Sequence, residues 1–537
     1  MKINRGVNRL IKFICLICIS ILVILIYSCN VKIGDGEYVE FSKNNIFVIL
    51  VFISIFFSIL LLIDKINDIK ISKKNKIIFF IILLIFYLIA QIIWINIRRS
   101  YPIYDQYEVY NDAKLIANGN IDKLIKNEYL QMYPHQTTLI IFYSIIFKIC
   151  GTTNVLILQY LNAIANIFTI IGLYLIAKLI GDKKNTLNSF AVTFLSLAFI
   201  PLSMLSTFVY GDLLGLAFAI FSIYFIIKYS KLQKVRYLFI SAILMNFSYF
   251  CRTNMLIFFI ALVIYLCLDC IRFVSLIKEK SDYTGKSKFL KILFKVLLIF
   301  LFISICIIPT SIVKSYMEVT LQLDASGKFP TIGHINHGIS SEGFNGPGWY
   351  VDKYFDEWSE NGHNNEVLKQ RAINIIKYYL NNPINCFEFF KNKIASIWAE
   401  PTFESIWYNT GYMDINKENI TEKEMLVSRS LNGFLTNNYI FFIIFGKIIL
   451  IIIYTSVLIF TLRNKNLNNE QVLLILIFLG GFAFQLFWEG KSRYVLPYVI
   501  ILIPIASIGV KENIKWIKDI LNKIKGKFYK SNKNMVK

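Results

Sequence analysis

The sequence predicts an all-α polytopic membrane protein with about 12 transmembrane helices, an interfacial helix and a small, mostly helical extracytoplasmic lobe. Three observations support this fold class. Of the 537 residues, 56% are hydrophobic and only 17% are charged, whereas soluble domains contain about 25% charged residues. Several apolar runs reach the roughly 18 residues that a helix needs to cross a bilayer. The basic residues gather in short segments between these runs, as they do on the cytoplasmic side of membrane proteins.

The apolar runs give the candidate spans in order. The first follows a basic N-terminus and is similar to a signal peptide, but its apolar core is long, so we expect an uncleaved span. The run 137–150 is short, which is more typical of an interfacial helix than of a spanning one. The runs are 11–29, 46–63, 77–97, 137–150, 154–179, 188–209, 213–228, 235–250, 254–272, 291–313, 438–462, 471–488 and 494–510.

Charge fixes the expected orientation. If 137–150 does not span, both termini are cytoplasmic together with most of the basic segments, as the positive-inside rule requires. These segments are 64–76, 181–187, 228–236, 272–291 and the tail after 510. The long loop 314–437, in which acidic residues outnumber basic ones, then lies outside with 98–136, 210–212, 251–254 and 489–493.

The same pattern divides the chain into five regions. The loop 314–437 is the only one long enough for a soluble lobe; we expect amphipathic helices at 365–382 and 383–401 and an irregular Gly- and His-rich stretch before them. The regions are a two-span N-terminal addition with its cytoplasmic loop (1–76), a transmembrane core with the external loop 98–136 (77–313), the extracytoplasmic lobe (314–437), the C-terminal spans (438–510) and a basic cytoplasmic tail (511–537).

Two classes of function are disfavoured by composition. The net charge of +23 suits nucleic acid in a soluble protein, but here the basic residues lie in loops between apolar helices, so no nucleic-acid partner is expected. The nine cysteines form no framework, and the two CxxC pairs lie in apolar helices without further ligands nearby, which predicts inert buried thiols.

The stretch "YPIYDQYEVY" (101–110) places a carboxylate next to the membrane on the predicted outer face. Asp105 there is suited to act as a general base toward an incoming hydroxyl. It is also suited to bind a divalent metal such as Mg or Mn through oxygen. The simpler alternative is an ordinary aspartate that caps the following helix.

The surrounding residues "YDQYEVYNDAKLIANGN" and "YLQMYPHQTTLIIF" resemble the first external loop of the glycosyltransferase C superfamily, and in particular bacterial membrane enzymes similar to protein O-mannosyltransferases. Those proteins carry an acidic pair, which Asp105 and Gln106 match at the first position only. "YPHQ" (133–136) matches their second element. Further landmarks follow in order over about residues 77–510: "VYGDLLGL", "CRTN", "GPGWY", "WAEPTF" and "EGKSRYVLPY".

The resemblance implies transfer of a sugar from a polyprenyl-phosphate carrier to a glycan or protein acceptor outside the lipid bilayer, with inversion and with Asp105 as base. A leaving phosphate needs cations, and Arg252, Lys491 and Arg493 lie at the outer ends of spans. Gln106 and His135 are further candidates for binding the phosphate or the sugar. Secondary candidates are Asp212, Glu400 and Glu489.

Five of these candidates have a structural alternative. For Arg252 it is to extend to the membrane surface, for Lys491 and Arg493 to anchor a helix end, for Glu489 to pair with either of them, and for Asp212 to cap a span.

Two other functions remain open at this point. A transporter or flippase of lipid-linked saccharides should carry charges near the middle of its spans and often shows repeated halves; this chain shows few such charges and no repeat. A polysaccharide polymerase or ligase would share the many spans and the large loop, but would not need Asp105.

Overall fold

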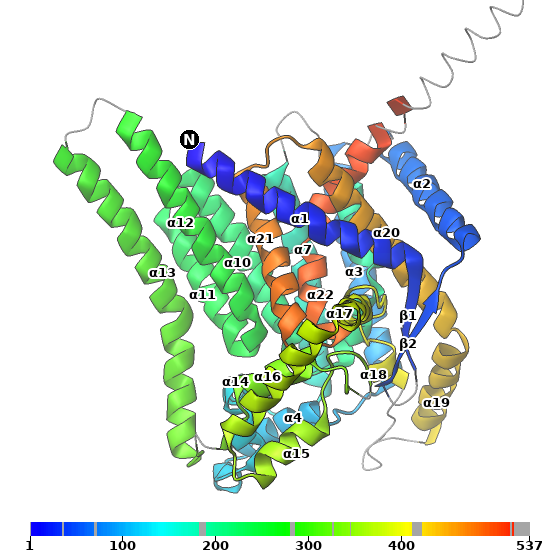
Figure 1. Cartoon of the computed structure of the whole chain (residues 1–537), viewed down its shortest axis with the longest axis vertical. Coiled ribbons are helices and arrows are strands. Elements are labelled where there is room, and N and C mark those ends of the chain that lie inside the picture. Colours follow the sequence, from blue (N-terminus) through cyan, green and yellow to red (C-terminus); the bar gives the residue numbers. More distant parts are fainter. Residues whose placement is uncertain are drawn as a thin grey trace, which may run out of the picture.

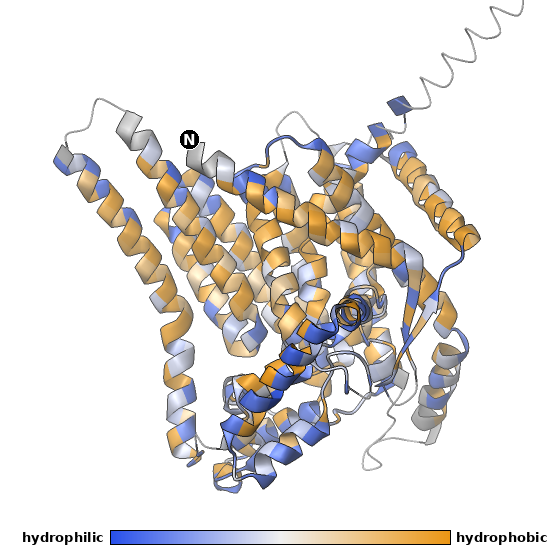
Figure 2. Ribbon diagram, in the orientation of Figure 1, coloured by the Kyte–Doolittle hydropathy of each residue, from blue (hydrophilic) through white to orange (hydrophobic). Residues whose placement is uncertain are grey.

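The computed structural model describes residues 2–34, 37–68, 72–181, 189–279, 285–324, 327–343, 345–410, 422–515 and 518–519. It confirms the all-α polytopic fold: long apolar helices stand side by side, and shorter, more hydrophilic helices cover one end of the bundle (Figures 1 and 2). Parts of four basic segments used to predict the orientation lie outside the described residues: 69–71, 182–187, 280–284, and 516–517 with 520–537.

Nine of the described helices are long and apolar enough to cross a membrane. These are α1 (Lys2–Ser28), α2 (Ile46–Asp68), α3 (Lys73–Arg98), α7 (Leu156–Ile180), α10 (Asp212–Leu232), α12 (Leu256–Glu279), α13 (Gly285–Thr320), α20 (Tyr439–Arg463) and α21 (Asn469–Phe487). The chain is therefore a multi-pass membrane protein.

Two bent pairs raise the possible number to eleven. One joins α8 (Ser189–Ala198) to α9 (Ile200–Met204) and η4 (Leu205–Thr207) at 51°; the other joins α22 (Ser492–Ile500) to the helical residues Ile503–Lys515 at 60°. Pro201 and Pro504 follow the two breaks, and a proline lacks the N–H that would continue the preceding helix. The predicted twelfth span corresponds to α11 (Val235–Cys251), which is shorter, so the number 12 stays a prediction.

The first external loop and the predicted lobe lie together at one end of the bundle, while the N-terminus and the last described residues lie at the other (Figure 1). The loop folds into α4 (Asp105–Ala117), η2 (Ile121–Leu124), α5 (Glu128–Met132), η3 (Pro134–Gln136) and α6 (Thr137–Cys150). At 14 residues α6 is too short to cross a bilayer. Which end faces the cytoplasm stays a prediction.

The lobe is helical, as predicted. It contains α14 (Thr331–Ile339), α15 (Asp352–Glu360), α16 (Asn365–Asn381), α17 (Pro383–Trp398), α18 (Trp407–Thr410) and α19 (Glu422–Asn437). The irregular structure expected for the Gly- and His-rich stretch is wrong over α14. Close packing explains its glycines, because a Cβ at Gly338 would lie 2.2 Å from the carbonyl oxygen of Phe487.

A small antiparallel hairpin between α1 and α2 was not predicted. Strands β1 (Cys29–Ile33) and β2 (Val39–Lys43) pair with Val31 opposite Phe41. The hairpin is tied to the lobe, since the Val39 amide donates to the Asn345 carbonyl at 2.7 Å. The N-terminal region thus contacts the end of the molecule that carries the loop 98–136 and the lobe.

Candidate functional site

Asp105 is the first residue of α4, so its carboxylate lies at the positive end of a 13-residue helix. Tyr104 before it turns the chain with a φ of 49°. Asp105 keeps an exposed surface although protein groups surround it on several sides. Burial raises the pKa of its carboxyl group above the ordinary value; the charges of Lys491, Arg493 and Arg252 act in the opposite direction, and Glu489 raises the pKa further. Asp105 therefore lies within electrostatic reach of three cations.

Two of these cations share one carboxylate. Arg252 Nε lies 3.1 Å from Asp212 Oδ1, and Arg493 Nη1 lies 3.1 Å from Asp212 Oδ2. Asp212 begins α10 directly after Gly211, whose φ of 82° and close approach to the Cys251 carbonyl require a glycine. Arg252 directly follows α11 and Arg493 is the second residue of α22, so helices far apart in sequence bring the two guanidinium groups together.

The third cation is paired with a carboxylate that sequence reasoning missed. Lys491 forms an ion pair with Glu37 at the tip of the β1–β2 hairpin. Burial raises the pKa of Glu37, and Lys491 acts against that rise. The sequence signal for Glu37 as a site residue was weak. The orientation rule also places the loop between the first two spans outside, but nothing local links Glu37 to a lysine 454 positions later.

Glu400 and Glu404 contact the start of α22, in the segment that carries Lys491 and Arg493. Buried Glu400 accepts hydrogen bonds from the Thr402 amide at 2.8 Å and from Ser492 Oγ at 2.8 Å. Glu404, also missed from sequence, accepts from the Arg493 amide at 3.3 Å. Glu400 thus holds the start of α22 in place and is enclosed by protein.

Glu489 faces the lobe. Its Oε2 lies 3.2 Å from Nδ1 of His334 on α14, and its amide donates to the His334 carbonyl at 3.1 Å. Burial acts to raise the pKa of Glu489, but the hydrogen bond to His334 and the charges of His334, His337 and Lys491 outweigh it, and the pKa is lowered. Glu489 therefore stays ionised and couples α14 to the cation-bearing loop.

Gln106 and His135 both lie in the segment 98–136. The Gln106 side-chain oxygen accepts from the Val209 amide at 2.9 Å, which ties α4 to the turn before α10. Burial, together with the charge of Arg252, lowers the pKa of His135 to about 3, so its imidazole is neutral near pH 7. A neutral ring can donate one hydrogen bond to an anion, but it adds no positive charge.

Tyrosine hydroxyls form a further part of the site that the sequence did not single out. Tyr129 and Tyr210 hydroxyls are 3.1 Å apart, and Gln136 Nε2 donates to the Tyr210 hydroxyl at 2.6 Å. The Tyr210 ring lies 4.4 Å from the Arg252 guanidinium carbon. Burial raises the pKa of Tyr129, Tyr133 and Tyr210, and the charge of Asp105 adds to this. These groups are neutral donors around the carboxylate.

The residues present fit an anion better than a resident metal. Within the described ranges no three His, Cys, Asp or Glu side chains gather closely enough to hold a metal ion. The electrostatic neighbours of Asp105 include three cations, which disfavour a further cation. The predicted divalent metal therefore stays a prediction.

Residues 138–305 match the family described as dolichyl-phosphate-mannose-protein mannosyltransferase, which confirms the resemblance over α6 to α13. No curated protein gave a match. The matched segment contains Asp212 and Arg252, whereas Asp105, Lys491 and Arg493 lie outside it.

Two similar solved structures are of an oligosaccharyltransferase from Archaeoglobus fulgidus. One is the archaeal enzyme AglB in complex with an inhibitory peptide and a dolichol-phosphate (TM-score 0.37, 12% identity, 82% of this chain and 51% of that chain). The other is the apo form (TM-score 0.37, 13% identity, 82% and 52%). The chain spans about half the length of these proteins.

Proposed function

Because residues 138–305 match the protein mannosyltransferase family, we propose that the chain is an inverting membrane glycosyltransferase. It moves a sugar from a polyprenyl-phosphate donor to a glycan or protein acceptor on the extracytoplasmic side, with both termini in the cytoplasm. The observation that carries the proposal is the Asp212 carboxylate, which lies 3.1 Å from both Arg252 and Arg493 and so holds two phosphate-binding cations together, with Asp105 within electrostatic reach of them.

The three cations suit the donor phosphate. Arginine holds phosphate oxygens bidentately and lysine acts as a point charge. Asp212 fixes the two guanidinium groups before the donor arrives, so little reorganisation is needed as negative charge grows on the leaving phosphate. One such preorganised contact contributes roughly 2–4 kcal/mol to transition-state stabilisation.

Asp105 suits the acceptor. The acceptor oxygen attacks the anomeric carbon from the side opposite the phosphate, the bond from carbon to phosphate oxygen breaks, and polyprenyl phosphate leaves with both bonding electrons. Asp105 takes the proton of the acceptor hydroxyl, and its exposed surface lets that proton pass to water afterwards. A raised pKa makes Asp105 a stronger base than an ordinary aspartate.

The proposal is tested with purified protein in proteoliposomes that contain a polyprenyl-phosphate sugar labelled in the sugar, together with crude cell-envelope acceptors. The expected result is label in the acceptor fraction and free polyprenyl phosphate in equal amount. Intact donor moved to the other leaflet without bond cleavage would instead identify a flippase. Label in polymers built from lipid-linked units, with full activity in the Asp105→Asn variant, would identify a polymerase or ligase.

A further inference from the structure

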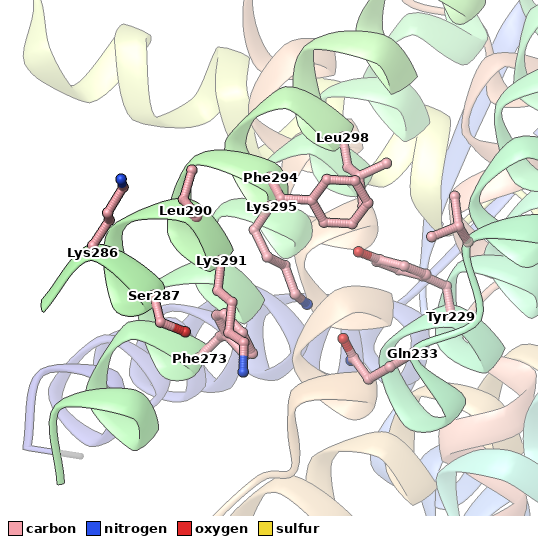
Figure 3. A pocket seen from close by; sticks show the side chains of 11 residues that line it. Tyr229, Gln233, Phe273, Lys286, Ser287, Leu290, Lys291, Phe294, Lys295 and Leu298 are labelled. Carbon is pink, nitrogen blue, oxygen red and sulfur yellow. The ribbon is translucent and has the colours of Figure 1, made fainter. Parts of the chain in front are cut away.

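Buried lysines in this chain are held in two different ways. Lys295 lines a cavity of about 580 Å³ between α13 and the α10–α11 turn, and its Nζ lies 2.9 Å from Asp269 Oδ2, so a carboxylate neutralises it (Figure 3). Lys393 on α17 is also buried, but its ammonium group donates to main-chain carbonyl oxygens. Burying a charge costs free energy unless it is paired or hydrogen-bonded, so these carbonyl contacts offset the cost of burying Lys393.

The carbonyl groups that Lys393 binds belong to two helix ends. Its Nζ donates to the carbonyl oxygen of Gly338 in the last turn of α14. It also donates to the carbonyl oxygens of Leu486 at 3.0 Å and Trp488 at 2.8 Å, at the end of α21. The last carbonyl groups of a helix have no partner within it and carry the negative end of its dipole. One ammonium group, which has three N–H donors, therefore joins the ends of α14 and α21.

Two glycines leave room for the Lys393 side chain. A Cβ at Gly348 would lie 2.7 Å from Lys393 Cδ, and a Cβ at Gly490 would lie 3.5 Å from Lys393 Cε. The Gly490 amide donates to the Gly348 carbonyl oxygen at 2.8 Å, so the two segments are joined beside the lysine. Lys393 thus packs against the "GPGWY" segment of the lobe and against the "EGKSR" segment that carries two cations of the candidate site.

The Trp488 carbonyl that Lys393 binds lies directly before the candidate site. The Trp488 ring stacks on His334, with the ring centres 4.8 Å apart. The next residue, Glu489, has Oε2 3.2 Å from His334 Nδ1, and Lys491 follows two positions later. A change in the position of Trp488 would therefore move Glu489 and Lys491 with it.

The contacts of Lys393 depend on its charge. Burial lowers the pKa of Lys393 to about 7, and the charge of Glu489 acts in the opposite direction. Around the same loop also lie His334 and His337 on α14 and Lys491 directly before α22. Burial lowers the pKa of His337 to about 4, so this ring is neutral near pH 7. The ammonium form of Lys393 has a donor for each of its carbonyl partners, whereas the neutral amine has one donor fewer and a lone pair that repels the remaining oxygen.

We propose that Lys393 is a positioning residue for donor binding, which joins the ends of α14 and α21 and so holds the loop 488–491 with Lys491 directed at the donor phosphate. Lys393 is enclosed by protein, so it acts through this loop. The inference rests on the function proposed above, because it takes the donor phosphate to bind at Lys491 and its neighbouring arginines. Donor affinity should then be highest where Lys393 is protonated and should fall as the pH rises through about 7.

The test measures donor binding separately from transfer. Full-length protein in a neutral detergent is titrated with a labelled polyprenyl-phosphate sugar without acceptor, and the Kd is measured from about pH 6 to about pH 9. The donor phosphate is a diester and keeps one negative charge over this range. The wild-type Kd should rise roughly tenfold, since one hydrogen bond to a charged group contributes about this factor. In Lys393→Met, whose side chain has a similar length but no N–H, the Kd should be as high as that of wild type at about pH 9 and should not change with pH.

Two further variants separate positioning from stability. Lys393→Arg keeps its charge over the whole range, so its Kd should not rise with pH. Lys391→Met removes an exposed lysine from the same helix and should keep the wild-type Kd and its pH dependence. Thermal unfolding in detergent identifies any variant that has not folded.

The outcomes distinguish this inference from the proposed reaction. A rise in Kd that persists in Lys393→Met or in Lys393→Arg would come from another group, such as Asp105 or His334, and would overturn the role of Lys393. Transfer of label by wild type with a Kd that is independent of pH would overturn this role alone. Donor binding with the expected pH dependence but without transfer would support the role of Lys393 and refute the proposed reaction.

Discussion

Replacing Asp212 by asparagine should loosen the cation pair at the candidate site. The change keeps the shape of the side chain but removes the negative charge 3.1 Å from both Arg252 and Arg493. At an effective dielectric of about 20, each pair is worth roughly 5 kcal/mol before the desolvation cost is subtracted. The two arginine side chains are only 8% and 4% exposed, so neither is freely rehydrated, and breaking such a buried pair costs about 3–5 kcal/mol of folding free energy.

The loss is measured by thermal unfolding in detergent together with kcat/KM for the donor. We expect a lower melting temperature and a fall of roughly 10²–10³-fold in kcat/KM, because the phosphate contacts are no longer held in place. Glu357→Gln is the control, since it breaks the ion pair of Arg371 between α15 and α16. It should lower stability by about 1 kcal/mol or less without changing donor kinetics. Wild-type stability and kinetics in Asp212→Asn would refute the assigned role of the shared carboxylate.

Three other substitutions test neighbouring parts of the account. Because the pKa of Asp105 is raised, kcat/KM should rise with pH through a value above the ordinary aspartate range near about 4. Lys491→Met removes a charge that lowers this pKa, so in that variant the rise should move to higher pH. Coincident pH–rate profiles of wild type and variant would contradict this. Glu37→Gln removes the carboxylate that competes with phosphate for Lys491, so the donor KM should fall roughly threefold to tenfold with kcat retained; an unchanged KM would show that no competition exists. Gly211→Ala would place a Cβ 2.3 Å from the Cys251 carbonyl at a φ of 82°, so the melting temperature should drop by the equivalent of about 2 kcal/mol or more, and a stable alanine variant would show that the turn is not required.

The long apolar runs predicted the spans well because burial in lipid imposes a simple length and composition on each helix. The bends before Pro201 and Pro504 were not predicted, although the prolines were visible, since a proline marks a possible break without giving its angle. The glycines of α14 led to an expectation of irregular structure. Gly338 instead allows close contact with the Phe487 carbonyl, and a local sequence pattern does not show such a tertiary contact.

Most candidate residues of the site could be chosen one by one from the sequence, but their arrangement could not. Asp105, Arg252 and Arg493 could be chosen because each stands at the outer end of a predicted span or in an outer loop. The sharing of Asp212 by two arginines depends on how α10, α11 and α22 pack, and no sequence period encodes that contact. Glu37 was missed because the hairpin that carries it is a two-stranded element between two membrane helices.

The most direct test of the central claim is a single-turnover measurement with the Asp105→Asn variant, using saturating polyprenyl-phosphate sugar and acceptor. The variant should bind donor as wild type does while the rate of transfer falls about 10²–10⁴-fold. Glu108→Gln is the matched control, because it makes the same change from carboxylate to amide about one turn farther along α4. It should retain a rate within about threefold of wild type, since surface changes of this kind alter little. A wild-type transfer rate in Asp105→Asn would contradict the account.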